Sequence, residues 1–172
     1  MTKLMARKAS VSPYRACLYA IGAGVHAVPA LLMRFQDEKI VQHDMSWLAP
    51  TVPKKDGGFN YADIPYHADF ATFEAEAIRI IDAAAVSDDL GETEDPFAAV
   101  TFLSCLPWMD YTSINNALRD KDDCTPRVSW GKIVDESGRS RMSMTLEVHH
   151  ALVDGADVGA YFEKVQNVLD TF

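Results

Sequence analysis

Cysteine is scarce in this chain, and the few present are poorly spaced for a shared role. Cys17, Cys105 and Cys124 are odd in number and lie far apart among 172 residues. That pattern indicates neither a disulfide framework nor a zinc site, so we expect a reducing, cytoplasmic environment. Carboxylates and histidines also form no cluster at ligand spacing, and we expect no bound metal.

Excess positive charge is also lacking. Acidic residues outnumber lysine and arginine by 25 to 16, which gives a formal net charge of −9. This balance argues against a protein that binds nucleic acid or an anionic membrane non-specifically. A local basic patch, for example for a phosphorylated cofactor, remains compatible with it.

The chain contains no internal repeat, no low-complexity tract and no linker-like stretch. Residues 1–172 are therefore predicted to form one domain, and that length is sufficient to bury a hydrophobic core.

One long hydrophobic run does occur, at residues 16–33, directly after several basic residues. A signal peptide with a basic start, or a marginal membrane helix, would show this pattern. His26, Pro29 and two glycines interrupt the run, and its length is at the lower limit for crossing a bilayer. We therefore favour a buried core helix that begins at Pro13, a residue tolerated in the first helical turn.

The rest of the chain alternates between short strand-like runs and helical patterns. Helices are predicted over 13–27, 70–85 and 156–172, the last of them from apolar residues recurring every three or four positions. Strands are predicted at 39–42, 59–62, 97–106, 127–134 and 140–148, with solvated connections at 50–58 and 87–95. We expect an α+β fold with a mixed, mainly antiparallel sheet and packed helices.

The most informative stretch joins the last strand to the last helix. Within 140–148, apolar residues alternate with polar ones, so one face of this strand should be buried. The sequence His149-His150-Ala-Leu-Val-Asp154-Gly155 follows at once. If the strand continues so far, His150 lies on the apolar side. A rigid strand-to-helix corner can hold an imidazole, the side chain best suited to proton transfer near neutral pH.

Simpler roles are open for these residues. Two adjacent histidines in a strand point to opposite faces, so they cannot share one metal ion without distortion. They can instead be structural and cap a helix. Asp154 can be a helix N-terminal residue that accepts hydrogen bonds from free amide groups.

Two further motifs lie between the predicted strand 97–106 and the predicted strand 140–148. Pro107-Trp-Met-Asp-Tyr-Thr-Ser113 comes directly after the buried strand, and Pro126-Arg-Val-Ser129-Trp130-Gly-Lys lies at the start of the next one. A serine in a loop is by itself most often a turn residue. The combination of the three motifs is what carries information.

Together, HHxxxDG at 149–155 and PWxxYxS at 107–113 resemble the chloramphenicol acetyltransferase family, and more loosely the cores of dihydrolipoamide acyltransferases. The resemblance covers essentially the whole chain. It implies that His150 is the general base, that Ser113 stabilises an oxyanion, and that Ser129, next to Trp130 at the cofactor-binding position, holds a water near the same intermediate.

The resemblance also implies a reaction and an assembly. An acetyl group would pass directly from acetyl-CoA to a hydroxyl of a small molecule, possibly chloramphenicol, which would confer antibiotic resistance. The family forms homotrimers whose active sites lie between subunits. Neither nucleic acid nor a membrane is an expected partner.

One departure from the family pattern bears on activity. Members usually carry about forty further residues before the first helix, including an arginine that pairs with the motif aspartate. Arg7 and Arg15 are not at that position, so Asp154 is expected to lack its cation. A catalytically weak binding or assembly domain is therefore an alternative. A lipoyl-type acyltransferase core is another, supported by Val-Asp-Gly-Ala-Asp at 153–157.

Overall fold

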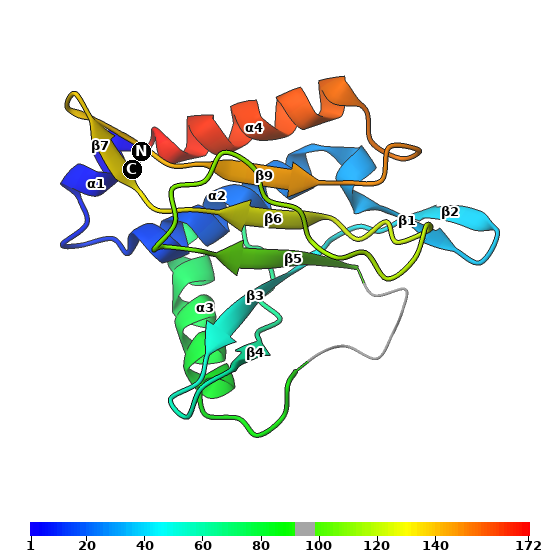
Figure 1. The fold of residues 1–172 in the computed structure, drawn as a ribbon, viewed down its shortest axis with the longest axis horizontal. Helices are drawn as coiled ribbons and strands as arrows, with labels where there is room; N and C mark the ends of the chain where they lie inside the picture. Colours follow the sequence, from blue (N-terminus) through cyan, green and yellow to red (C-terminus); the bar gives the residue numbers. More distant parts are fainter. Residues whose placement is uncertain (92–98) are drawn as a thin grey trace.

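A five-stranded sheet forms the centre of the molecule in the computed structural model, which describes residues 1–91 and 99–172. Its strand order is β4-β3-β5-β6-β9 (Figure 1). The bounds are β3 Trp47–Pro53, β4 Phe59–Tyr61, β5 Val100–Cys105, β6 Arg127–Trp130 and β9 Met144–Glu147. Two hairpins lie outside it, β1 Met33–Gln36 with β2 Lys39–Gln42, and β7 Val134–Glu136 with β8 Arg139–Arg141.

The pairing confirms a mixed, mainly antiparallel sheet with packed helices. Of the six strand pairings in the described residues, four are antiparallel, whereas β3, β5 and β6 run parallel at the centre. Parallel neighbours need long connections on the faces of a sheet. One of these connections, residues 106–126 between β5 and β6, carries the predicted serine motif.

The three long helices cover one face of the sheet (Figure 1). They are α2 Pro13–Ala27, α3 Phe70–Ala84 and α4 Gly155–Leu169, close to the predicted bounds. A short α1, Thr2–Ala6, and the 3₁₀ helix η1, Pro29–Leu32, were not predicted. The termini lie side by side, and the Met1 amine is 3.6 Å from an Asp170 carboxylate oxygen.

Most of the hydrophobic run at 16–33 lies in the core helix α2, and its last residues form η1 and the first residue of β1. Ser12 caps α2 by accepting from the Arg15 amide, and nine of its fifteen residues are buried. Gly24 allows α4 to approach closely, because a Cβ at this position would lie 2.7 Å from Val165. None of the helices described is long and apolar enough to cross a membrane.

Residues 50–58 were wrongly predicted to be entirely loop. β3 runs through Pro50 to Pro53, although proline cannot donate a ladder hydrogen bond. The strand pairs with β5 through residues 47–50 and with β4 through 51–53. Pro50 therefore lies where the partner changes, and its missing N–H is tolerated there. The solvated connection predicted at 87–95 and the strand predicted at 97–106 fall partly on 92–98, outside the described residues.

The predicted pair 127–134 and 140–148 is interrupted by a bulge. Trp130 pairs with Met144, but the next pairing is Val134 with Arg141, so three residues on one strand face two on the other. Each predicted strand is thereby divided in two, β6 and β7 on one side and β8 and β9 on the other. The apolar face predicted for 140–148 is confirmed, because Met142, Met144, Leu146 and Val148 all pack against the core.

Candidate active site

His150 lies in the turn between β9 and α4, with its side chain exposed. The expectation that it lies on the apolar side was wrong, because β9 ends at Glu147 and the backbone then turns, with Val153 N–H donating to the His149 carbonyl. The His150 Nδ1 atom is 3.2 Å from the Val153 carbonyl oxygen. Since a carbonyl only accepts, Nδ1 carries the hydrogen when the imidazole is neutral. Nε2 is then an unprotonated acceptor open to solvent.

His149 has a different environment. Its Nδ1 accepts from the Ala151 amide at 3.2 Å, and its Nε2 lies 3.1 Å from the Lys121 carbonyl oxygen, to which it donates. The ring also meets Phe35 edge-on at 5.0 Å. Both nitrogens are thus engaged with the chain, which suits a structural role.

Asp154 caps helix α4. Its carboxylate accepts from the Ala156 amide at 2.8 Å and the Asp157 amide at 3.1 Å, and the Asp157 carboxylate accepts from the Asp154 amide. Asp154 is exposed and makes no ion pair with a described residue. Arg15 pairs with Glu74 at 2.9 Å instead. The geometry is that of a capping box, which accounts for a carboxylate without a cation.

Ser113 belongs to the segment that crosses the sheet face opposite the helices. The Tyr111 hydroxyl donates to the Ser129 carbonyl at 2.7 Å, and the Asn116 amide donates to the Glu147 carboxylate at 3.0 Å. Ser113 lies between these two anchors and is exposed. The segment that carries Ser113 is therefore anchored to β6 through Ser129 and to β9 through Glu147, and Figure 1 shows it running across the sheet.

Gly131 permits that close crossing. A Cβ at Gly131 would lie 2.5 Å from the Met109 carbonyl oxygen and 3.1 Å from the Tyr111 ring. The Lys132 amide donates to the same Met109 carbonyl at 2.7 Å. Only glycine leaves room for the motif segment to pack directly on β6.

Ser129 and Trp130 point to opposite faces of β6, as neighbours in a strand must. Ser129 faces the crossing segment and is 1% exposed, and its hydroxyl has no hydrogen-bond partner among the described residues. Trp130 is 2% exposed in the core and stacks on Tyr14, with ring centroids 5.9 Å apart. A contact between Trp130 and a bound cofactor would have to use its backbone.

A cavity of about 270 Å³ opens beneath the crossing segment, beside Ser129. Most of the residues that line it were not predicted from the sequence. Its polar side chains come from β3, β4, β5, β6 and the segment itself, and they are Thr51, Tyr61, Ser104, Asn116, Arg119, Arg127 and Ser129. Alternation was the available signal, because Arg127 shares the outward face of Ser129.

Arg127 is held rigidly in this cavity wall. Its guanidinium lies 2.6 Å from Asp123, a carboxylate only 3% exposed, and 5.8 Å from the centroid of Phe102. Burial raises the pKa of Asp123, but hydrogen bonds from Arg127 and from the Arg119 amide outweigh it and leave that pKa below its ordinary value. The Asp123 carboxylate is therefore ionised at neutral pH.

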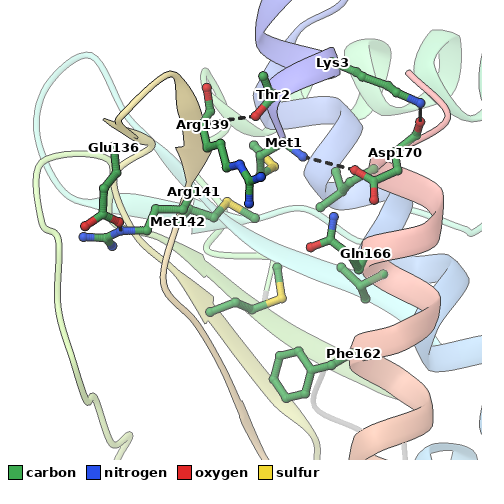
Figure 2. Close-up of a pocket in the computed structure, with 14 residues that line it drawn as sticks. Met1, Thr2, Lys3, Glu136, Arg139, Arg141, Met142, Phe162, Gln166 and Asp170 are labelled. Atoms are coloured by element: carbon green, nitrogen blue, oxygen red, sulfur yellow. Dashed lines mark hydrogen bonds and ion pairs between the residues drawn. The ribbon is translucent and has the colours of Figure 1, made fainter.

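A larger hollow lies elsewhere, between β8, β9 and helix α4 (Figure 2). It measures about 1110 Å³, with Met142, Phe162 and Leu169 among its apolar lining and Arg139 and Asp170 among its polar lining. Neither His150 nor Ser113 is among the residues that line this hollow or the cavity beside Ser129. Among the described residues β9 pairs only with β6, and Met144 of β9 is one of the residues that line this hollow.

A comparison with known protein families identifies the family of this chain. The family model described as chloramphenicol acetyltransferase matches residues 2–166. The chain belongs to the chloramphenicol acetyltransferase family. It is therefore an acyltransferase.

Individual relatives agree with this membership. Chloramphenicol acetyltransferase of Bacillus pumilus is 25% identical over 174 residues, covering 99% of this chain and 79% of the relative. Chloramphenicol acetyltransferase 3 of Escherichia coli is 23% identical over 163 residues, covering 92% and 75%. A solved chloramphenicol acetyltransferase has a TM-score of 0.83 and 26% identity over 98% of this chain and 82% of its own.

The fold is shared more widely. The dihydrolipoamide acetyltransferase (E2p) of Azotobacter vinelandii has a TM-score of 0.71 at 15% identity, covering 98% of this chain and 76% of that one. At this level the likeness concerns fold alone.

No hydrogen bond among the described residues joins Ser113 to His150 within the chain. Ser113 is bracketed by anchors at Tyr111 and Asn116, whereas His150 lies beyond the end of β9, past His149 and its contact with Lys121. Both side chains are exposed.

Proposed function

We propose that this protein is an O-acetyltransferase that moves an acetyl group from acetyl-CoA to a hydroxyl of a small molecule. The observation that carries the proposal is the hydrogen bond between His150 Nδ1 and the Val153 carbonyl. It fixes the ring tautomer and orientation and leaves Nε2 free to accept a proton, as a general base requires.

In the proposed reaction, His150 Nε2 takes the proton of the acceptor hydroxyl while that oxygen attacks the thioester carbonyl. The new C–O bond forms first, giving a tetrahedral oxyanion. Ser113 would donate a hydrogen bond to this oxyanion, and such donors supply a large share of acyl-transfer catalysis. The C–S bond then breaks, and the proton on His150 passes to the CoA thiolate. No acyl-enzyme forms.

The acceptor site we assign is the cavity beneath the crossing segment. It adjoins Ser129, whose buried hydroxyl lacks a partner in the described residues. Buried polar groups in native proteins are nearly always hydrogen-bonded, so an unpaired hydroxyl at a cavity wall suits a bound water or ligand. Ser129 would hold a water near the intermediate.

A homotrimer would complete this site. His150 and Ser113 are both exposed, and no hydrogen bond among the described residues joins them, so we propose that a neighbouring subunit supplies one of them to each site. The shared hydrophobic core of sheet and helices supports residues 1–172 as a single acetyltransferase domain. We place the enzyme in the cytoplasm, with chloramphenicol as one candidate acceptor.

Two alternatives have specific support. The likeness to dihydrolipoamide acetyltransferase covers nearly the whole chain, which favours a test of dihydrolipoamide as acceptor. The exposed Asp154, engaged in capping rather than with a cation, favours a weakly active member that serves in binding or assembly. The same thiol-release assay separates them, since each predicts a different acceptor or none.

Substitution of His150 tests the leading proposal. His150→Ala should lower the rate of CoA thiol release by about 10²–10⁴-fold, the usual loss for a general base. His149→Ala is the matched control, and it should lower stability more than activity because it removes the contacts with Lys121 and Ala151. Equal rate losses for both variants, or none for either, would contradict the assignment of the base.

A further inference from the structure

The carboxylate of Glu147, the last residue of β9, is bound by the segment that carries Ser113. Both of its oxygens lie 3.0 Å from the Asn116 backbone nitrogen, whose N–H they share, and the Asn116 side-chain amide donates to one of them. Both side chains are partly buried, and Glu147 forms no ion pair with the residues that the structure describes. Hydrogen bonds to an ionised acceptor are about twice as strong as those between neutral groups. The contact is therefore a strong anchor for the segment.

This anchor joins the two stretches of chain that hold the proposed catalytic groups. Asn116 follows Ser113 by three residues, and Glu147 precedes His150 by three. Three residues span at most about 11 Å, so each group stays close to the anchor. One carboxylate thus limits where the Ser113 segment can lie relative to the strand that leads to His150.

The rest of the segment has no equivalent anchor on the same side of Ser113. Along the chain after Asn116, the next hydrogen bond to the stretch around β9 among the described residues is at Lys121, whose carbonyl accepts from His149 Nε2 at 3.1 Å. Residues 117–120 lie between these two contacts and are exposed. Without the carboxylate, the backbone at Ser113 would be held mainly by the anchors that precede it.

We infer that Glu147 is a positioning residue, which holds the Ser113 hydroxyl in place by binding Asn116. In this role it touches neither substrate nor cofactor, and the inference rests on the proposed part of Ser113 in acetyl transfer. A misplacement of about 1 Å can cost a reaction about 10²-fold. An oxyanion donor acts on the transition state rather than on bound substrate. Loss of the anchor should therefore lower kcat and leave KM nearly unchanged.

Exchange of the two side chains tests the contact. Asn116→Asp sets two carboxylates against each other and should lower kcat for CoA thiol release about 10- to 100-fold. Glu147→Gln should cost less than about threefold, because the glutamine carbonyl still accepts from the Asn116 backbone. In the double variant the glutamine NH₂ group donates to the introduced carboxylate, so kcat should return to within about threefold of wild type. Asn115→Asp is the matched control, since it adds the same charge at an exposed neighbour and should leave kcat unchanged.

A double-mutant cycle tests whether Glu147 acts through Ser113. Glu147→Ala should lower kcat about 10- to 100-fold in the wild-type chain but less than about twofold in a Ser113→Ala chain, because the positioned hydroxyl is already absent. Equal factors in the two chains, or a double exchange that rescues nothing, would overturn the inference and leave the proposed function intact. An unimpaired Ser113→Ala variant would instead refute the proposed role of Ser113, and this inference with it.

Amide hydrogen exchange reports on the anchor without turnover. In Glu147→Ala, residues 113–117 should exchange about tenfold faster than in the wild type, whereas Asn115→Asp should leave their protection unchanged. Unchanged exchange in Glu147→Ala would overturn the inference. Turnover is followed with chloramphenicol and then with dihydrolipoamide as acceptor. Faster exchange in a protein that releases no thiol with either acceptor would uphold the anchor and contradict the proposed function.

Discussion

At the scale of single residues, the hydrogen bonds that a polar side chain already makes decide whether it is free to take part in catalysis. Ser113 is exposed, and its backbone is fixed by neighbours rather than by its own side chain. A hydroxyl held in this way can bind the transition state without first releasing another partner.

Ser113→Ala should accordingly lower kcat by about 10²–10³-fold and leave KM nearly unchanged, as for the loss of other oxyanion donors. Steady-state kinetics with a saturable acceptor would measure both constants. Ser137→Ala, in the distant β7–β8 turn, serves as the control and should change neither. A higher KM at constant kcat would reduce Ser113 to a loop residue that contacts substrate.

The second prediction at this scale concerns His26 and the dependence of stability on pH. Its Nδ1 donates to the Gly22 carbonyl at 2.8 Å, its Nε2 accepts from the Ser46 amide at 3.1 Å, and burial lowers its pKa below the ordinary 6.5. The unfolded imidazole thus binds a proton more readily than the folded one. The stabilisation is complete above pH 6.5 and is lost as the pH falls toward the depressed value.

Urea denaturation on either side of pH 6.5 checks this prediction. The free energy of unfolding of the wild type should fall toward acid pH more steeply than that of His26→Gln, which can still accept from the Ser46 amide but does not titrate. Parallel pH dependences in the two proteins would show that another group is responsible.

At the scale of elements, helix α4 depends on its first residue. Asp154→Ala should lower the free energy of unfolding by about 1 kcal/mol, the usual cost of losing an N-cap, whereas Asp154→Asn should cost little because asparagine also caps. Denaturant titration of both variants measures the difference. If Asp154→Asn were as destabilising as Asp154→Ala, the negative charge rather than the cap would be the important feature.

Gly131, which directly follows β6, and Gly159 in α4 provide a second contrast between elements. Gly131→Ala should displace the crossing segment, since its Cβ would meet a backbone oxygen, and should lower both stability and the rate of thiol release. Gly159→Ala has open space and lies inside α4, so it should stabilise the fold by about 0.5–1 kcal/mol. Thermal unfolding of the two variants should therefore shift in opposite directions.

The spacing of apolar residues along the sequence predicted most of the helices and strands, because an element with one buried face repeats its apolar residues at a regular interval. The bounds of α2 and β2 agree with prediction, and those of α3 and α4 differ by a residue to a few residues. β3 was missed because of its prolines. Pro50 is tolerated where the strand changes its pairing from β5 to β4, and that change depends on the tertiary structure. The bulge that divides 127–134 likewise depends on register, and no single strand reveals register.

The candidate site was predictable only in part for a related reason. Motif spacing selected Ser113, Ser129, His150 and Asp154, but Arg119 and Arg127 line the same cavity as Ser129 only because the long connection folds back over β6. Alternation would place His150 on the apolar side only if the strand continued to it, and β9 ends at Glu147 instead, because alternation alone cannot locate the end of a strand.

At the scale of the whole molecule, the separation of Ser113 from His150 makes the proposed trimer testable. Chains carrying Ser113→Ala and chains carrying His150→Ala should each be nearly inactive. Co-expressed in equal amounts, they should regain about one quarter of wild-type activity, since a random pairing unites an intact His150 with an intact Ser113 in that fraction of shared sites. Light scattering on the same sample reports the mass, and sites contained within one chain would give no recovery.

The packing of α2 against α4 also fixes when folding can finish during synthesis. The face of α2 at Gly24 is covered by Val165 and Tyr161 of α4, which are synthesised long after α2. A ribosome-bound chain therefore exposes this apolar face of α2 until α4 emerges. Because chains grow at about 5–20 residues per second, that exposure lasts on the order of ten seconds. We expect a chaperone that binds apolar segments to bind the nascent chain there.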